Sequence, residues 1–394
     1  MRYCFLIIFS LFAIGSSQGR TWTSAKGTKI EADLIRIKDD QVVLKKEDGE
    51  EISVEIDQLS KRDRDFLDSV KPRNLPKHIR FLYDRQPTRP NYDDKWPDKA
   101  EALGDIEITK VKEDAKTRQF IYHSPHYEFV CDVRLTLSVV KTFSKLFETT
   151  YDAMVKIPMS FDKARTSTPG HRYRVLLFAS RDDYVRNGGP PNSGGVYYPK
   201  TDIVMVPLRS LGVKRSGSKY TLDHQVANQT LSHELVHQLM DLTYFKHGSI
   251  GWFTEGMAEY VSSSPYQYGR FTFHNNITAI KNSITKYDSR TRTGSALGKK
   301  IKAPDLRAYM LQSYANFTKS GRFNYALGKA ITTYFIHMDD DGSRKNINAF
   351  LKAMRKGNKG DALLKTLLAG RSWDELENDI SAAWKKRGLQ ITFQ

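Results

Sequence analysis

The sequence contains very little cysteine. Its 394 residues include two, Cys4 and Cys131, and Cys4 lies in an N-terminal segment that we expect to be removed. An exported protein with one remaining cysteine forms no internal disulfide, although disulfides are common in oxidising compartments. The stability of the folded chain must therefore come from its hydrophobic core or from a bound metal.

Long apolar segments are also missing. The one apolar run, about ten residues from Phe5 to Ile14, follows the charged Arg2 and precedes small residues at 15–17. A bilayer-spanning helix needs about 20 apolar residues, so this layout is typical of a secretory signal peptide. We predict a signal peptide over residues 1–19, a secreted or periplasmic protein, and no membrane span after cleavage. A retained membrane anchor is the alternative.

Motifs for nucleotides and nucleic acids are absent as well. The glycine-rich stretch at residues 188–195 lacks the Gly-Lys-Ser/Thr ending of a phosphate-binding loop. The net charge is +17, but lysine and arginine are scattered, with modest clusters such as residues 299–302. We interpret this charge as a solvated basic surface that suits anionic surroundings, such as an envelope polymer, and predict no nucleic-acid partner.

Short β-type segments and turns fill residues 20–68. Residues 28–37 alternate apolar and polar side chains, and an Asp-Gly hairpin signal at residues 48–49 precedes a second alternating segment. A short helix is expected over residues 59–67. About fifty residues in three to five strands is the size of a small SH3-like β-barrel.

This segment resembles the SH3-like homology domain first described in an endocytic adaptor. The matching residues are Trp22-Thr23-Ser24, the Asp48-Gly49 hairpin, Leu59-Ser60, Asp63 and Phe66-Leu67. The resemblance implies a small β domain whose ligand would be a protein or an anionic envelope polymer. A packing module without a ligand of its own is the alternative.

The rest of the chain divides into a linker and a second domain. Residues 69–115 are rich in proline and charge and are predicted to be a linker. In the second domain, residues 116–394, apolar residues recur at helical spacing from Leu135 to Tyr151. Everything past Trp252 is predicted to be helical with loops. The predicted strands cover residues 120–131, 173–178, 196–198 and 203–206. The chain is therefore expected to be α+β.

The strongest chemical signal is a His-Glu-x-x-His segment at residues 231–237. On a helix, His233 and His237 lie within about 40° of each other and can bind one ion, while Glu234 lies on the neighbouring flank. Leucines at every fourth position pack the opposite face into a core. The pattern predicts a zinc-binding helix with Glu234 as general base. A chance match, expected in about one or two chains in a hundred, is the alternative.

A second acidic segment supplies the missing ligand. A catalytic zinc site takes three protein ligands and keeps one position open. Glu255, in the segment Trp-Phe-Thr-Glu-Gly-Met-Ala-Glu-Tyr at residues 252–260, is our candidate for the third ligand. Glu259 follows one turn later on the same face and is expected to accept a ring N–H of His233 or His237, which fixes the tautomer. The alternatives are that Glu259 itself binds the metal or is a solvated helix residue.

These residues predict a hydrolytic reaction. Zinc would lower the pKa of a water, and Glu234 would take its proton for attack on a peptide carbonyl. A donor for the resulting oxyanion is expected from Tyr325, with Tyr334 as second choice, although aromatic core packing is the alternative for both. An extended peptide would lie along a strand edge. That edge is expected to consist of Gly195, Val196 and Tyr197.

The two motifs together resemble the gluzincin metallopeptidases, in which a His-Glu-x-x-His helix is completed by the glutamate of a downstream Trp-x-x-Glu-Gly-x-Ala segment. The closer likeness is to exported, bacterial-type peptidase MA-like proteins and covers Tyr122 to Trp384. It implies a zincin-like domain with a small mixed sheet, the His-Glu-x-x-His helix and a helical C-terminal part. It also implies one Zn²⁺ held by His233, His237 and Glu255, and a peptide or protein substrate.

The sequence departs from the best-known gluzincins in two respects. The spacing between His237 and Glu255 is slightly shorter than in the familiar aminopeptidases, and we find no motif for binding a free amino terminus. Endopeptidase action is therefore preferred. The alternative function is a non-catalytic, zinc-containing scaffold that binds envelope material or another protein, although a scaffold would not need Glu234.

Overall fold

The computed structural model shows an α+β protein that divides into two compact units, Met1–Arg85 and Gln86–Gln394. The predicted signal peptide, residues 1–19, and residues 71–91 of the predicted linker lie outside the described residues. No helix in the described part of the chain is both long and apolar enough to cross a bilayer. The structure describes residues 20–38, 41–46, 48–70, 92–102, 104–159, 172–199, 201–217, 219–223, 229–241, 244–245, 250–288 and 293–394.

The first unit is a small antiparallel sheet with a helix. Its four strands pair in chain order: β1 (Arg20–Thr23), β2 (Lys29–Lys38), β3 (Gln41–Lys46) and β4 (Glu51–Glu55). A 3-10 turn, η1 (Ile56–Gln58), and α1 (Lys61–Val70) follow. Trp22, Leu44 and Leu67 are buried together in its core. The small sheet agrees with the predicted SH3-like domain.

A buried carboxylate joins the start and the end of this unit. Asp63 accepts hydrogen bonds from the backbone N–H of Thr23 and the hydroxyl of Ser60, both at 2.8 Å. The indole N–H of Trp22 donates to the carbonyl of Ala32 at 2.9 Å. These bonds satisfy buried polar groups between distant segments of the unit.

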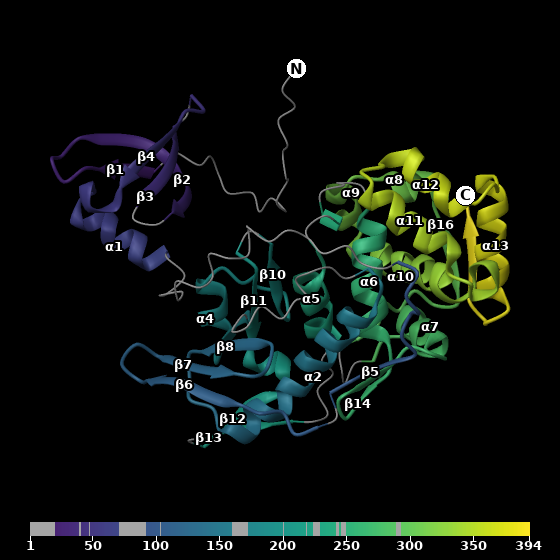
Figure 1. Ribbon diagram of the computed structural model, residues 1–394, viewed down its shortest axis with the longest axis horizontal. Helices are drawn as coiled ribbons and strands as arrows, with labels where there is room; N and C mark the ends of the chain where they lie inside the picture. Colours follow the sequence, from purple (N-terminus) through teal and green to yellow (C-terminus); the bar gives the residue numbers. More distant parts are fainter. Residues whose placement is uncertain are drawn as a thin grey trace. The chain divides into compact units, whose positions relative to one another are not determined.

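A six-stranded mixed sheet organises the first part of the second unit (Figure 1). Its order is β10-β11-β9-β8-β7-β6, with β8, β9 and β11 parallel and the other pairs antiparallel. The strands are β6 (Thr109–Asp114), β7 (Gln119–His123), β8 (Tyr127–Cys131), β9 (Tyr173–Phe178), β10 (Val196–Tyr198) and β11 (Ile203–Pro207). The helix α2 (Leu137–Lys156) packs on the sheet through Phe143 and Phe147, whose rings contact Phe129 edge-on.

Two sequence predictions in this region need correction. The predicted linker to residue 115 is too long, because β5 (Lys99–Glu101) and β6 already belong to the second unit. Isolated apolar residues anchor this charged segment: Trp96 is buried and its indole N–H donates to Asn348 at 3.0 Å. The single strand predicted over 120–131 is the hairpin β7–β8, since the N–H of Ser124 bonds the carbonyl of Tyr127.

A second hairpin separates the sheet from the helix that carries His233 and His237. The strands β10 and β11 form the predicted hairpin, but η3 (Leu208–Leu211), β12 (Val213–Ser216) and β13 (Lys219–Leu222) follow before α5 (Gln229–Leu239). The predicted strands ended at residue 206, so β12 and β13 were missed. Polar residues on β12 and β13 leave little apolar alternation to reveal these strands, because the exposed side chains face solvent.

The C-terminal part is mainly helical, as predicted. Its helices are α6 (Gly251–Ser263), α7 (Ile277–Thr285), α8 (Leu306–Leu311), α9 (Tyr314–Lys319), α10 (Gly321–His337), α11 (Lys345–Arg355), α12 (Gly360–Leu368) and α13 (Trp373–Lys385). Short strands interrupt it: β14 (Tyr266–Gln267), β15 (Arg270–Thr272), β16 (Lys300–Ala303) and β17 (Gln390–Phe393). The prediction missed these strands because two to four residues are too few to show a period.

Two glycines let α6 and α10 pack side by side (Figure 1). A Cβ added to Gly256 would lie 2.7 Å from the carbonyl oxygen of Gly328, and one added to Gly328 would lie 2.8 Å from the carbonyl oxygen of Trp252. Only glycine permits such close backbone contact at both positions. This packing sets the position of Glu255, which directly precedes Gly256.

Candidate metal centre

Two adjacent helices, α5 and α6, carry the predicted ligands (Figure 1). Leu231, Leu235 and Leu239 of α5 are buried in the hydrophobic core. His233 and His237 leave α5 on another face, toward Glu255 of α6. The helical spacing of the leucines thus directs the two imidazoles to the neighbouring helix.

The three predicted ligand atoms form a nearly equilateral triangle. The Oε2 atom of Glu255 lies 3.0 Å from Nε2 of His233 and 3.1 Å from Nε2 of His237, and the two nitrogens are 3.1 Å apart. Three ligands at zinc bond lengths around a tetrahedral ion lie about 3.3 Å from one another. Two imidazole nitrogens and one carboxylate oxygen also form a donor set that Zn²⁺ favours. The residues present therefore fit this metal.

The carboxylates in and around the triangle favour a positive charge at this position. Burial opposes protonation of His233, but hydrogen bonds and charges from Glu255 and Glu259 outweigh it and raise the pKa of His233 well above its usual value. Burial likewise acts against the charge of Glu255, yet His237 and His233 hold the pKa of Glu255 far below its usual range. A buried carboxylate that stays ionised beside two imidazoles is a suitable anionic ligand for a cation.

Glu234 lies beside the triangle without being part of it. Its Oε2 accepts the backbone N–H of Tyr197 at 2.9 Å. Burial raises the pKa of Glu234, although the nearby His233 and His237 lower it. A carboxylate beside the three ligand atoms lies where a general base for a metal-bound water is required. The bond to Tyr197 fixes the direction in which this carboxylate points.

The predicted substrate strand is the edge of the sheet at this point. Val196 and Tyr198 pair with β11, and β10 has no further strand beside it among the described residues. The N–H of Tyr197 points away from β11 and toward Glu234. Gly195 precedes the strand, and a Cβ there would lie 3.3 Å from the carbonyl oxygen of Met205 and 3.7 Å from Glu234 Cγ. The edge strand β10 therefore lies beside Glu234, the candidate general base.

Glu259 connects the triangle to a buried lysine. Its Oε1 lies 3.2 Å from Nδ1 of His233, and its Oε2 lies 2.7 Å from the ammonium of Lys329, which is 2% exposed. The ammonium also donates to Ser263 at 3.0 Å and Ser283 at 2.9 Å. Despite its burial, Glu259 keeps a pKa far below its usual value, chiefly because of Lys329. Glu259 is therefore placed to accept the Nδ1–H of His233, while Nε2 of the same ring faces the triangle.

The sequence prediction did not include Lys329. It is a single charged residue in the apolar stretch of α10, and a lysine is almost never fully buried unless it is paired. The isolated charge in an apolar segment was the sequence feature from which Lys329 could have been identified.

His237 differs from His233, because its buried Nδ1 has no hydrogen-bond partner within the described part of the chain.

Two tyrosines border the triangle, one of them missed from the sequence. The ring of Tyr325 stacks on His233 with centroids 6.0 Å apart, and burial followed by the charge of Glu255 raises its pKa well above the usual value. Tyr314, on the short helix α9, donates its hydroxyl to Oε1 of Glu255 at 2.8 Å. Tyr314 is 42% exposed, so no apolar period indicated it. Tyr334 lies elsewhere, with its hydroxyl bonded to Asp339 at 3.0 Å.

Comparison with known proteins concerns the first unit. The family model described as SLA1 homology domain 1, SHD1, matches residues 15–75. The match covers the small sheet and α1, and it agrees with the predicted SH3-like domain. No curated protein matches the chain.

Proposed function

We propose that the second unit is a zinc-dependent metallopeptidase that hydrolyses peptide bonds within a chain. One observation carries the proposal: His233, His237 and Glu255 converge while Glu234 lies beside them, held by the N–H of Tyr197. Three ligands with an adjacent, separately anchored carboxylate are the arrangement that metal-assisted hydrolysis requires.

Zinc bound by these ligands would lower the pKa of a coordinated water and polarise the substrate carbonyl. Glu234 would then accept a proton and later deliver it to the leaving amine. The bond from the N–H of Tyr197 holds this carboxylate in place for both transfers. Glu259 keeps Nδ1–H of His233 engaged, so that Nε2 stays available as a ligand.

The edge strand β10 suggests how a substrate is held. In an antiparallel pair, alternate residues direct their N–H and C=O groups outward, and the outward N–H of Tyr197 is already used by Glu234. The carbonyl of Tyr197 and the backbone of Gly195 would bond an extended peptide. Binding a peptide by its backbone favours action within chains over action at free ends.

Tyr325 is the proposed donor to the oxyanion. Its ring lies against His233, and the charge of Glu255 together with burial keeps its hydroxyl protonated. A protonated hydroxyl beside the reacting carbonyl stabilises the negative charge of the transition state. Tyr314 is bonded to Glu255 and would orient that ligand.

The first unit and the N-terminal segment give the proposal its setting. An exported protein with an SHD1 domain and a basic surface would act on extracellular or periplasmic substrates near anionic envelope material. The SHD1 domain would hold the enzyme there by binding a protein or an envelope polymer.

The experiment compares the wild-type protein with Glu234→Gln. Both forms should contain one zinc per chain by elemental analysis, because Glu234 is outside the triangle. Mass spectrometry of a mixture of unstructured peptides should show cleavage by the wild type and a loss of at least about a thousandfold in kcat for the variant. Equal activity of the variant would reject the mechanism. A zinc-loaded wild type that cleaves nothing would instead favour a binding scaffold.

A further inference from the structure

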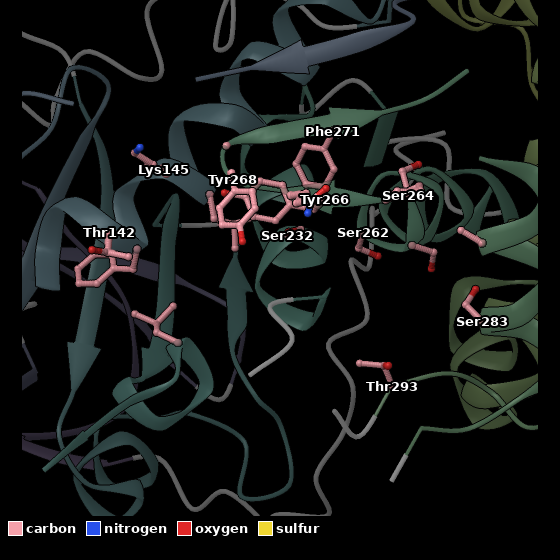
Figure 2. A pocket seen from close by; sticks show the side chains of 18 of the residues that line it. Thr142, Lys145, Ser232, Ser262, Ser264, Tyr266, Tyr268, Phe271, Ser283 and Thr293 are labelled. Carbon is pink, nitrogen blue, oxygen red and sulfur yellow. The ribbon is translucent and has the colours of Figure 1, made fainter. Parts of the chain in front are cut away.

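Charge is distributed unevenly over the second unit. A cavity of about 1010 Å³, bordered by the end of α6, is lined by three aspartates and three lysines, so its charges balance (Figure 2). The charged residues of this lining are Asp105, Asp223, Asp288, Lys141, Lys145 and Lys286. The small sheet formed by β16 and β17 differs from the cavity, because the segments that form it carry cations and no carboxylate side chain.

Two lysine-rich segments that are far apart in the sequence meet at this sheet. Residues 299–302 enter and form β16, while residues 385–387 end α13 and lead toward β17. The two strands pair in parallel, with Lys300 opposite Gln390, and the N–H of Gln390 donates to the carbonyl of Lys299 at 2.8 Å. Because the strands are parallel, both lysine segments come to the same end of the sheet.

Seven cations gather on and beside the first residues of these strands. Lys281 of α7 joins the two segments, since its ammonium donates to the carbonyl of Arg387 at 3.1 Å. We call the group the β16–β17 patch; its members are Lys281, Lys299, Lys300, Lys302, Lys385, Lys386 and Arg387. All are exposed except Lys281 and Arg387, which are half-buried, so a partner can reach them.

No carboxylate neutralises the patch in the part of the chain that the structure describes. None of its members forms an ion pair with an aspartate or glutamate there. The acidic residues nearest to the two segments along the chain are engaged elsewhere: Asp305 caps α8, and Asp379 pairs with Arg371. The C terminus of α13 favours cations in its own last turn, but Lys299 and Lys300 lie on no helix.

The patch offers charge without apolar surface. The apolar side chains of its segments are buried: Ile301, Ala303, Trp384, Leu389 and Ile391. No large apolar side chain of residues 299–303 or 384–393 is exposed. A protein interface has an apolar core, a helix at a bilayer surface inserts apolar side chains, and a sugar or base stacks on an aromatic ring. A partner that is held by charge alone is a polyanion.

We propose that the β16–β17 patch binds a linear polyanion through its charge, without recognising the backbone of the polymer. An extended chain of anions can contact the cations of the strand, the end of α13 and α7 in turn, and its binding releases the small ions that the polymer holds. Six of the seven cations are lysines, which act as point charges and do not impose the paired geometry of a guanidinium. The proposal does not depend on the peptidase activity.

The test is calorimetric titration of the purified protein with two polymers that share negative charge and differ in backbone, polyvinylsulfate and poly-D-glutamate. Both should bind, and raised salt should weaken both. Polyvinylsulfate should bind more tightly, because its charges lie closer together. Phosphatidylglycerol vesicles should bind less tightly than either polymer, since the patch has no exposed large apolar side chain to insert. Binding of only one polymer, or tighter binding of the vesicles, would overturn the proposal.

A triple variant locates the binding. Lys299→Gln, Lys300→Gln and Lys386→Gln together should weaken the binding of both polymers at least about tenfold. The fall of log affinity with log salt concentration should become shallower by about two, because three cations no longer contact the polymer. All three side chains are exposed, so thermal unfolding should match that of the wild type.

A second triple variant is the charge-matched control. It carries Lys116→Gln, Lys219→Gln and Lys356→Gln, at three exposed lysines that form no ion pair among the described residues and belong to separate parts of the second unit. Its affinity and salt dependence should stay close to those of the wild type. Equal losses in the two variants would show that the overall charge binds the polymer and would sink the idea.

Discussion

Two buried clusters of histidine and glutamate in the second unit have opposite electrostatic balances. In one, Glu128 accepts hydrogen bonds from the guanidinium of Arg174, 2.7 Å from its Nε, and lies 3.0 Å from His123. In the other, Glu255 and two imidazoles meet at the candidate metal centre, and the buried cation Lys329 contacts Glu259 instead of the triangle.

The difference shows how a structural ion pair can be distinguished from a binding site. Glu128 already has a cationic partner, and although burial opposes its charge, His123 and Arg174 lower its pKa to about 2. The triangle consists of three atoms of types that ligate metals, and Glu259 and Tyr314 contact two of the residues that supply them. The chain neutralises one cluster internally and leaves the other suited to an external cation.

The largest effect is expected from removing the third ligand. Glu255→Gln replaces an anionic ligand by a neutral amide and should weaken zinc binding at least about a thousandfold. Competition with a fluorescent chelator measures this affinity. Glu128→Gln is the matched control and should bind zinc as the wild type does, because its carboxylate already has Arg174. Similar losses in both variants would remove the distinction between the clusters.

The converse experiment concerns stability. Glu128→Gln leaves the buried guanidinium of Arg174 without its counter-charge and should lower the free energy of unfolding by about 3 kcal/mol. The double variant Glu128→Gln, Arg174→Met should recover much of this loss in denaturant titrations.

The contribution of this cluster to folding stability depends on pH through the pKa of Glu128. His123 and Arg174 outweigh the effect of burial and lower the pKa of Glu128 from 4.5 to about 2. A lowered folded pKa contributes stability that is present above the unfolded value and is lost as the pH falls toward the folded one. The stability difference between wild type and Glu128→Gln should therefore shrink between about pH 4.5 and pH 2. A constant difference across that window would contradict the assignment.

A smaller effect is expected from the two tyrosines. Tyr325→Phe should lower kcat about a hundredfold with little change in KM or zinc affinity, because the lost donor acts on the transition state. Tyr314→Phe should instead weaken zinc binding several-fold, since Tyr314 contacts Glu255. Tyr334→Phe is the control and should keep normal kinetics. Peptide-cleavage kinetics measures kcat and KM, chelator competition measures zinc affinity, and the two together distinguish the three variants.

A further effect on zinc affinity is expected from Lys329. Lys329→Met removes the cation that keeps Glu259 charged and oriented toward His233, and should weaken zinc binding about tenfold. Glu259→Gln should reproduce this loss, and the two substitutions together should cost little more than either alone. Additive losses would show that Lys329 acts independently of Glu259.

The sequence predicted elements with a strong period and missed those held by distant contacts. The strand Tyr173–Phe178 and the long helix α2 were confirmed because apolar residues recur in them at strand or helix spacing. The segment around Trp96 was assigned to a linker because its composition is charged, yet a single buried indole anchors it. Composition averages over a window, whereas one buried aromatic residue suffices to hold a segment.

The residues of the candidate site likewise fall into those predicted from the sequence and those found only in the tertiary structure. The sequence by itself determined that His233 and His237 share one helix face with Glu234 on its flank, because helical geometry relates residues four apart. Motif spacing suggested Glu255 and Glu259. Only the tertiary structure decided that Lys329 and Tyr314 contact those glutamates. These contacts depend on how α6 packs against α10 and α9, and Gly256 and Gly328 permit that packing through close backbone contact that no local period encodes.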